Sequence, residues 1–322
     1  MSTTGLLPIL GSTQLLGVIG DPVEHSLSPV MHNAAIQALA TQQGRQGVSH
    51  VYVPLPIANP DLGTALAGLQ AMGCQGFNVT IPHKQAIVPF LESITPIAAR
   101  IGAVNTVWRT ATGWAGTNTD MQGFMAPLQH LQAHWPDGTA VILGNGGAAR
   151  AIIAGCETLQ FQHIQIVGRD DQRLAQLLQD FTPSPAQITL HTWDEITDLL
   201  PHTDLLVNTT PIGMAPAVDR MPLTGEAMAQ LPNHALVYDL IYTPQPTQLL
   251  KEAIAQGYQA IDGLEMLVQQ GAAALEIWLG SPPEVDVMRR AAAEILNSRA
   301  GEKQGFQGVG PGTLARQRSA PD

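Results

Sequence analysis

The clearest chemical signal in the sequence is a run of glycines between an apolar segment and a helical one. In VILGNGGAAR (141–150), Gly144, Gly146 and Ala149 satisfy the spacing G-x-G-x-x-G/A. Glycine permits the tight turn and lets backbone N–H groups approach a pyrophosphate, which also meets the positive end of the following helix. We therefore predict a dinucleotide-binding turn, with an ordinary glycine-rich turn as the alternative. Its phosphate-contacting residues would be Gly144, Asn145, Gly146, Gly147 and Ala148.

The next apolar strand indicates which dinucleotide binds. Sites for NAD usually place Asp or Glu about 20 residues after the glycines, where it holds the ribose 2′-hydroxyl. Here the strand ends in Gly168 and Arg169 instead. An arginine can pair with a 2′-phosphate, and Arg173 and Arg150 are placed to reach the same anion. The sequence therefore favours NADP over NAD.

Asp170 complicates this preference. Its carboxylate would either repel a 2′-phosphate or accept a hydrogen bond from a ribose hydroxyl. The other interpretation is an N-cap for a helix over 171–180, because Asp is a preferred residue at that position.

Further polar blocks lie at the ends of the apolar runs. They are HSLSPVMHN (25–33), NVTIPHK (78–84), GAVNT (102–106), GTNTD (116–120), NTTPIGM (208–214), YDLIYTPQPTQLL (238–250) and DGLEMLVQQG (262–271). Taken together and in this order, the blocks resemble the shikimate dehydrogenase family, over about residues 14–298.

Two turns depart from the pattern of that family. Its phosphate loop usually reads GAGGA, whereas this chain has Asn145 at the second position. The turn after the second strand usually reads Asn-Arg-Thr, whereas this chain has Gly168-Arg169-Asp170 and so keeps only the arginine.

The resemblance implies an oxidoreductase that reduces 3-dehydroshikimate to shikimate with NADPH, in the pathway to chorismate and the aromatic amino acids. It implies that Ser26 and Ser28 bind the substrate carboxylate, although Ser28 alone would read as a helix N-cap. It further implies that Lys84 and Asp120 form the catalytic pair, with a helix N-cap as the alternative for Asp120. The remaining implied ligands are Thr80, Asn105, Tyr242 and Gln270 for the substrate, and Met214, Leu240 and Gly263 for the nicotinamide side of the cofactor.

In the implied reaction NADPH supplies a hydride to the carbonyl carbon. Lys84 either delivers the proton to the developing alkoxide or stabilises its charge. Histidines flank the site, and we interpret His25, His32 and His83 as packing or hydrogen-bonding residues. The alternatives for the whole chain are a quinate/shikimate dehydrogenase of broader specificity, using NADP or NAD, and a ligand sensor without activity.

The elements that must position these residues follow from hydrophobic periodicity. Short apolar runs alternate with helical segments, which predicts parallel sheets covered by helices on both faces. The fold class is α/β with two domains, a substrate domain and a Rossmann-like doubly wound NADP-binding domain, and the active site in the cleft between them. We assign 1–121 plus 259–298 to the substrate domain, 122–258 to the cofactor domain and 299–322 to a disordered tail. The strands expected are 15–19, 50–55, 76–80, 103–108, 139–144, 164–168, 204–209 and 235–240, and the helices 29–43, 60–72, 119–133, 147–159, 171–180, 246–256, 263–279 and 283–297.

Composition excludes several classes of protein. A net charge of −11 disfavours nucleic-acid binding through a basic surface, and no apolar run is long enough to span a membrane. The two cysteines, Cys74 and Cys156, lack metal-ligand spacing, so we expect buried reduced thiols and no metal. A small-molecule substrate and a cytoplasmic location are expected, and the oligomeric state stays open between monomer and homodimer.

Overall fold

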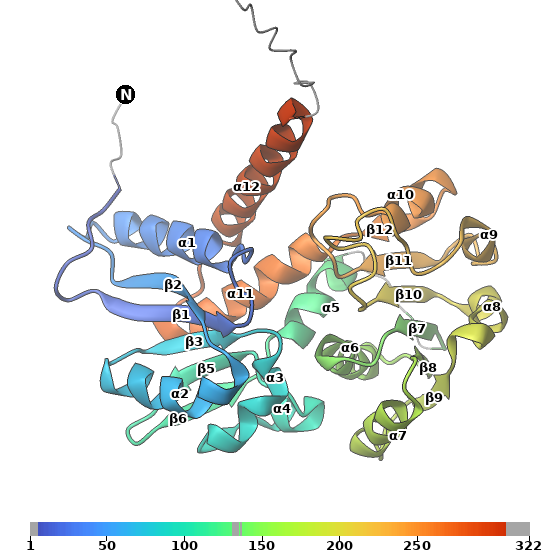
Figure 1. Ribbon diagram of the computed structural model, residues 1–322, viewed down its shortest axis with the longest axis horizontal. Helices are drawn as coiled ribbons and strands as arrows, with labels where there is room; N and C mark the ends of the chain where they lie inside the picture. The colour runs from blue at the N-terminus through green and yellow to red at the C-terminus, as the bar shows by residue number, and fades with distance from the viewer. Residues whose placement is uncertain (1–5, 131–134, 136, 307–322) are drawn as a thin grey trace, which may run out of the picture.

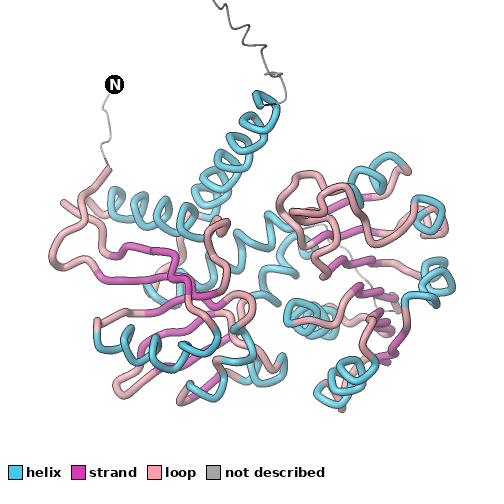
Figure 2. Tube along the Cα trace, in the orientation of Figure 1, coloured by secondary structure: helices cyan, strands magenta, loops and turns pink. Residues whose placement is uncertain are grey.

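The computed structural model describes residues 6–130, 135 and 137–306. Within these residues the chain builds two six-stranded sheets, each covered by helices, and helices α5 and α11 pack together between them (Figure 1). Figure 2 shows the strands gathered in two separate groups, one on either side of this central pair of helices.

The first sheet is mixed, and its strand order is β2-β1-β3-β5-β6-β4. β1 is parallel to β2 and β3, whereas β5 is antiparallel to both β3 and β6. The expectation of a purely parallel sheet is therefore wrong here. Only residues 110–113 connect β5 to β6, which suits a hairpin and is too short for a parallel crossover. The strands are β1 Gln14–Gly20, β2 His50–Pro56, β3 Gly76–Val79, β4 Ser93–Ile94, β5 Thr106–Arg109 and β6 Trp114–Thr117.

This arrangement gathers chain ends at one edge of the first sheet. β1, β3 and β6 run in one direction and β5 runs in the other. The carboxyl ends of β1, β3 and β6 therefore meet the amino end of β5 at a single edge.

The second sheet is fully parallel, with the order β12-β11-β10-β7-β8-β9. The chain moves outward from β7 to β9 and then returns to the other side of β7 with β10. In such doubly wound sheets ligands bind at the carboxyl ends of the strands where the direction reverses, here between β7 and β10. The strands are β7 Thr139–Leu143, β8 His163–Val167, β9 Gln187–His191, β10 Leu205–Asn208, β11 Leu236–Asp239 and β12 Gln259–Ile261.

Helices bury apolar side chains on both faces of each sheet. One face of the first sheet packs against α1, α11 and α12, and the other against α2 and α4. One face of the second sheet packs against α5, α6 and α7, and the other against α8, α9 and α10. The helices are α1 Ser28–Gln42, α2 Leu62–Ala71, α3 His83–Ala86, α4 Pro96–Ile101, α5 Asp120–His130, α6 Gly147–Thr158, α7 Asp171–Asp180, α8 Ile196–Leu199, α9 Gly225–Met228, α10 Gln248–Ala255, α11 Gly263–Leu279 and α12 Val285–Phe306.

Two predicted boundaries need correction. Residues 259–261 form β12 of the second sheet, so that sheet extends past the expected limit at 258. A strand of three residues is too short to show a periodicity of its own. Helix α12 reaches Phe306 and so includes residues assigned to the tail. The rest of the expected tail (307–322) and part of the expected boundary near 131–136 lie outside the described residues.

Both cysteines are buried and free, as predicted. Among the residues described, no helix is both long and apolar enough to cross a membrane.

Candidate active site

An ion pair between Lys84 and Asp120 lies at the edge of the first sheet where the carboxyl ends of β1, β3 and β6 meet the amino end of β5. Lys84 is in α3, just after β3, and Asp120 is the first residue of α5, just after β6. The Nζ–Oδ2 distance is 2.7 Å, and the side chains are 20% and 7% exposed. The other carboxylate oxygen accepts a hydrogen bond of 2.9 Å from Asn105 Nδ2. Both oxygens of Asp120 therefore orient other side chains of the site, which is a different role from that of a helix N-cap.

Asn105 joins this pair to α11. Its amide nitrogen also donates to Thr119 Oγ1 at 3.0 Å and Gln270 Oε1 at 3.3 Å, and its amide oxygen accepts from the backbone N–H of Thr119 at 2.8 Å. The side chain is held on all sides, because Asn105 is only 2% exposed. The structure thus brings together Lys84, Asn105, Asp120 and Gln270, four of the residues that the sequence predicted for the substrate.

The two predicted carboxylate-binding serines lie after β1. The hydroxyl of Ser26 accepts a hydrogen bond of 3.2 Å from the backbone N–H of Ser28. Ser28 is the first residue of α1, and the N-cap position belongs to Leu27, so the N-cap interpretation of Ser28 is wrong. Thr80, which directly follows β3, is tied to β1 through its backbone N–H and the carbonyl of Ile19, at 2.9 Å.

A buried polar chain leads from β2 to the residues of the ion pair, and sequence reasoning missed it. Tyr52 donates to Asn78 Oδ1 at 2.7 Å. Asn78 Nδ2 donates in turn to the backbone oxygen of Asn105 at 3.1 Å. Tyr52 and Asn78 lie inside otherwise apolar strands, and a polar residue at such a position was the available signal.

The flanking histidines support the site by packing. The His32 ring stacks on Tyr52 with centroids 4.1 Å apart, and its Nδ1 lies 2.8 Å from the carbonyl of Ser28. Burial lowers the pKa of His32 to about 4, so the ring is neutral near pH 7. His83 Nε2 lies 2.6 Å from the carbonyl of Ile57. These contacts match the expected packing or hydrogen-bonding roles of His32 and His83.

The glycine turn lies at the carboxyl end of β7. Gly144 has φ of +109°, and a Cβ there would lie 2.6 Å from Thr209 Oγ1. A Cβ added at Gly146 or Gly147, which open α6, would meet no heavy atom within 4 Å. Next to them the Nδ2 atom of Asn145 is buried and makes no hydrogen bond among the described residues. Free space at a helix N-terminus, next to the Asn145 donor that lacks a partner among the described residues, fits a dinucleotide phosphate group.

The turn after β8 resolves the role of Asp170. Its Oδ1 accepts from the backbone N–H of Arg173 at 3.1 Å, and its Oδ2 lies 3.3 Å from Arg173 Nε. The N-cap interpretation is therefore confirmed, and Asp170 and Arg173 are paired with each other. Arg169 is exposed, and no ion pair or hydrogen bond in the described part of the chain holds its guanidinium.

Arg150 is engaged away from the glycine turn. It is 6% exposed, donates through Nε to the carbonyl of Ile101, and places Nη2 2.7 Å from Asp180 Oδ2. Its guanidinium also lies over the ring of Phe181, 5.6 Å from the centroid. These contacts join α6 to α4 and α7, and they do not support the predicted contact with a 2′-phosphate.

The predicted residues of the nicotinamide side lie on the loops after β10 and β11 and at the start of α11. Gly263, which begins α11, is so close to Leu240 that a Cβ there would overlap the carbonyl oxygen of Leu240. Met214 lies in the loop after β10 and is 44% exposed. Tyr242 lies two residues beyond Leu240 and is half-buried.

A buried network fixes the two strands that carry these loops. Asp239 accepts hydrogen bonds from Asn208 Nδ2 at 3.0 Å, from the backbone N–H of Ile241 at 3.1 Å and from Thr247 Oγ1 at 2.7 Å. Burial outweighs these hydrogen bonds and raises the pKa of Asp239 to about 6. The network therefore holds the ends of β10 and β11 in register with each other.

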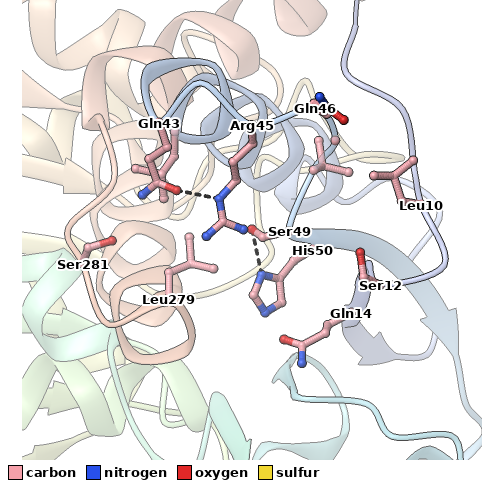
Figure 3. A pocket seen from close by; sticks show the side chains of 13 residues that line it. Leu10, Ser12, Gln14, Gln43, Arg45, Gln46, Ser49, His50, Leu279 and Ser281 are labelled. Carbon is pink, nitrogen blue, oxygen red and sulfur yellow. Dashed lines mark hydrogen bonds between the residues drawn. The ribbon is translucent and has the colours of Figure 1, made fainter.

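One hollow of about 540 Å³ lies away from all of these residues, near the amino ends of β1 and β2 (Figure 3). Arg45 and His50 are among its lining residues, and none of the predicted site residues is. No group of three His, Cys, Asp or Glu side chains that could hold a metal ion occurs among the residues described.

Comparisons with known proteins agree with this geometry. The substrate-binding domain model of shikimate dehydrogenase matches residues 18–107, and the C-terminal domain model of shikimate 5′-dehydrogenase matches 263–293. A shikimate dehydrogenase (NADP(+)) of Trichormus variabilis is 56% identical over 292 residues, which are 89% of this chain and 99% of that protein. A shikimate dehydrogenase (NADP(+)) of a Nostoc species is 55% identical over the same shares of the two chains.

A solved structure extends the likeness to the fold. A crystal structure of a shikimate dehydrogenase in complex with NADP⁺ superposes with a TM-score of 0.81 at 36% identity, covering 90% of this chain and 98% of the other. The chain therefore belongs to the shikimate dehydrogenase family.

Proposed function

We propose that Lys84 and Asp120 carry the chemistry of this chain, an NADP-dependent oxidoreductase that reversibly reduces 3-dehydroshikimate to shikimate in aromatic amino-acid biosynthesis. The observation that carries the proposal is the 2.7 Å contact between Lys84 Nζ and Asp120 Oδ2 at the edge where the strand ends of the first sheet meet. Curated relatives named for this activity, aligned over nine-tenths of the chain, support it.

Lys84 exchanges the proton of the reaction. In the direction of reduction, its ammonium group donates to the substrate oxygen that becomes a hydroxyl, and in oxidation the amine accepts that proton. Asp120 keeps the side chain oriented and stabilises its positive charge. Stabilisation of the developing alkoxide by the ammonium, without proton transfer, is the second way in which Lys84 can act.

The other polar residues hold the substrate in place. Ser26 and Ser28 bind its carboxylate, and Thr80, Asn105, Tyr242 and Gln270 bind its ring hydroxyls. Support comes from the hydrogen bonds from Tyr52 through Asn78 to Asn105, and from His32, which stacks on Tyr52 and lies 2.8 Å from the carbonyl of Ser28.

The glycine turn and the loops of the second sheet hold the cofactor. The backbone of Gly144 to Ala148 would bind the pyrophosphate, Gly168 and Arg169 the 2′-phosphate end, and Met214, Leu240 and Gly263 the nicotinamide end. When bound, NADPH supplies the hydride. Arg150, Asp170 and Arg173 would contribute by fixing α6 and α7 rather than by touching the phosphate.

The two sheets divide these tasks. We assign the first sheet with α11 and α12 to the substrate and the second sheet, residues 139–261, to the cofactor. We place the enzyme in the cytoplasm, where two free cysteines remain reduced. A homodimer is the oligomer to test against a monomer.

The first test is the steady-state oxidation of shikimate and of quinate with NADP⁺ and with NAD⁺, followed by the absorbance of the reduced nicotinamide. We expect the highest kcat/KM for shikimate with NADP⁺, because Arg169 has no partner among the described residues and Asp170 is occupied as a cap. An equal kcat/KM with NAD⁺ or with quinate would assign the chain to the broader quinate/shikimate dehydrogenases. Binding of NADP⁺ and shikimate without turnover would make it a sensor.

A further inference from the structure

The side-chain amide of Asn145 lacks a partner where one is expected. Its Nδ2 atom is buried and makes no hydrogen bond with any part of the chain that the structure describes. A buried donor without a partner destabilises the folded protein, and most such groups are satisfied by protein, water or ligand. Asn145 lies in the turn between β7 and α6, which fits a dinucleotide. Asn145 as a whole is only partly buried, so its amide meets a group of the bound cofactor when the side chain turns outward from this position.

The neighbour of this amide shows which part of the cofactor that is. A Cβ added at Gly168 would lie 3.1 Å from Asn145 Nδ2 and 2.9 Å from Leu174 Cδ2. Gly168 is buried at the end of β8, next to β7, and its φ lies outside the left-handed region. A glycine at position 168 is thus explained by the lack of space for a side chain and not by the backbone conformation. The amide extends across from β7 toward the end of β8, which is the side of Arg169.

The two departures from the family pattern are therefore in contact with each other. The chain has an asparagine in the phosphate loop where alanine is usual, and a glycine after β8 where asparagine is usual. The amide of Asn145 follows β7, and the space beside Gly168, which follows β8, admits it.

Arg169 follows Gly168 directly, and its guanidinium has no partner among the residues described. A neutral amide donor beside an unpaired cation suits a doubly charged phosphate, whose oxygens accept charge-assisted hydrogen bonds. The nearby carboxylate of Asp170 is turned to the cap of α7 and paired with Arg173.

We propose that the Asn145 side-chain amide binds the 2′-phosphate of NADP together with Arg169, and that Gly168 is required to admit this amide. The proposal rests on the NADP dependence given above and makes Asn145 a specificity-determining residue.

The test is isothermal titration of the full chain with NADP⁺, 2′,5′-ADP and NAD⁺. Asn145→Ala should raise the Kd of NADP⁺ and of 2′,5′-ADP about tenfold, the effect of losing one hydrogen bond to a charged group. The Kd of NAD⁺ should change less than about twofold, because it lacks the phosphate that this bond would reach. Gln179→Ala, an exposed amide on α7, is the matched control and should change none of these values.

A second variant tests the role of Gly168. Gly168→Ala should crowd both Leu174 and the Asn145 amide, displace the amide and so reproduce the selective loss for NADP⁺. The double variant should bind no more weakly than Asn145→Ala, because both changes remove one interaction. An unchanged Kd for NADP⁺ in Asn145→Ala, or an equal loss for NADP⁺ and NAD⁺, would overturn the proposal. If the unaltered chain itself failed to bind NADP⁺, the assigned cofactor would be wrong instead.

Discussion

At the scale of single residues, the site depends on a carboxylate with both oxygens occupied. Asp120 binds Lys84 through Oδ2 and Asn105 through Oδ1. Asp120 is nearly buried, whereas a fifth of the Lys84 side chain is exposed. The ammonium is thus the member of the pair that a substrate can reach, and the carboxylate fixes its position.

Replacing Lys84 should separate chemistry from binding. Lys84→Ala should lower kcat by about 10²–10⁴-fold, the range for a positioned proton donor, and change the KM for shikimate much less. Steady-state kinetics measure both values, and Lys251→Ala, an exposed lysine on α10, is the control. An unchanged kcat would remove Lys84 from the mechanism.

Asp239 should make stability depend on pH in an unusual direction. Its pKa is raised from 3.8 to about 6, so the folded protein binds this proton more tightly than the unfolded chain. Its contribution to stability is therefore present below the unfolded-state pKa and is lost as the pH rises through about 6. Asp239→Asn cannot titrate, so its free energy of unfolding relative to wild type should rise by about 2 kcal/mol between about pH 4 and pH 7.

Urea unfolding at several pH values measures this difference. Other carboxylates titrate equally in both proteins and cancel in the comparison. A constant difference between the two proteins would show that the three hydrogen bonds to Asp239 offset its burial.

At the scale of elements, the start of α11 must pass very close to the end of β11. The Cα of Gly263 lies against the carbonyl of Leu240, and its backbone N–H donates to the carbonyl of Ile241 at 3.3 Å. No side chain fits there, because the contact is with backbone atoms that belong to a strand end. This approach places Leu240 beside the helix that carries Gln270.

Gly263→Ala should therefore disturb both binding and folding. The new methyl group would force α11 and the Leu240 loop apart, which should weaken NADP⁺ binding by at least about tenfold and lower the melting temperature, since such overpacking costs about 1–3 kcal/mol. Gly68→Ala in α2 is the control, since nothing lies within 4 Å of its Cβ position. That variant should be neutral or more stable, as alanine is favoured in helices.

Two kinds of element could be predicted from the sequence. They are long helices with a clear hydrophobic periodicity and strands with an uninterrupted apolar run. The helix predicted over 263–279 matches α11, and the strands predicted around 15–19 and 164–168 match β1 and β8 within a residue or two at either end. β4, β9 and β12 were missed, and β6 with them. They are short or half-exposed strands without a clear alternation, and only their neighbours in the sheet determine them.

The residues of the site likewise divide into those that could be predicted from the sequence and those that could not. The motif residues Lys84, Asn105, Asp120 and Gln270 could be named from the sequence, and the structure connects them. Arg150 illustrates what could not be predicted, because helical spacing gives the direction of a side chain but not its partners. Its partners, Ile101 and Asp180, come from two other helices.

At the scale of the whole molecule, charged contacts between α4 and α6 tie the two sheets together. Arg100 on α4 binds Glu157 on α6, with Nη2 and Oε1 2.5 Å apart, and lies 4.9 Å from the centroid of the Phe181 ring. Arg150 approaches the same ring from the other helix. These contacts connect the part that would bind substrate to the part that would bind cofactor.

Glu157→Ala should loosen this connection. The carboxylate also accepts from Ser184 Oγ at 2.6 Å, and its loss leaves Arg100 without its main partner. We expect a loss of about 1–2 kcal/mol in the free energy of unfolding, between the values for exposed and buried ion pairs. Denaturant unfolding measures it, with Glu276→Ala, an exposed residue of α11, as the control. A loss no larger than that of the control would mean that the ion pair does not stabilise the contact.

The order of the chain has a consequence for its synthesis. The face of the first sheet formed by Leu16 and Val18 packs against Val268, Leu275 and Met288, which lie near the other end of the chain. A ribosome adds about 5–20 residues per second, so this apolar face emerges on the order of tens of seconds before its cover. The second sheet uses one continuous stretch of chain and can complete itself in the meantime. The nascent chain therefore exposes an unfinished apolar surface that a chaperone would recognise until α11 and α12 leave the ribosome.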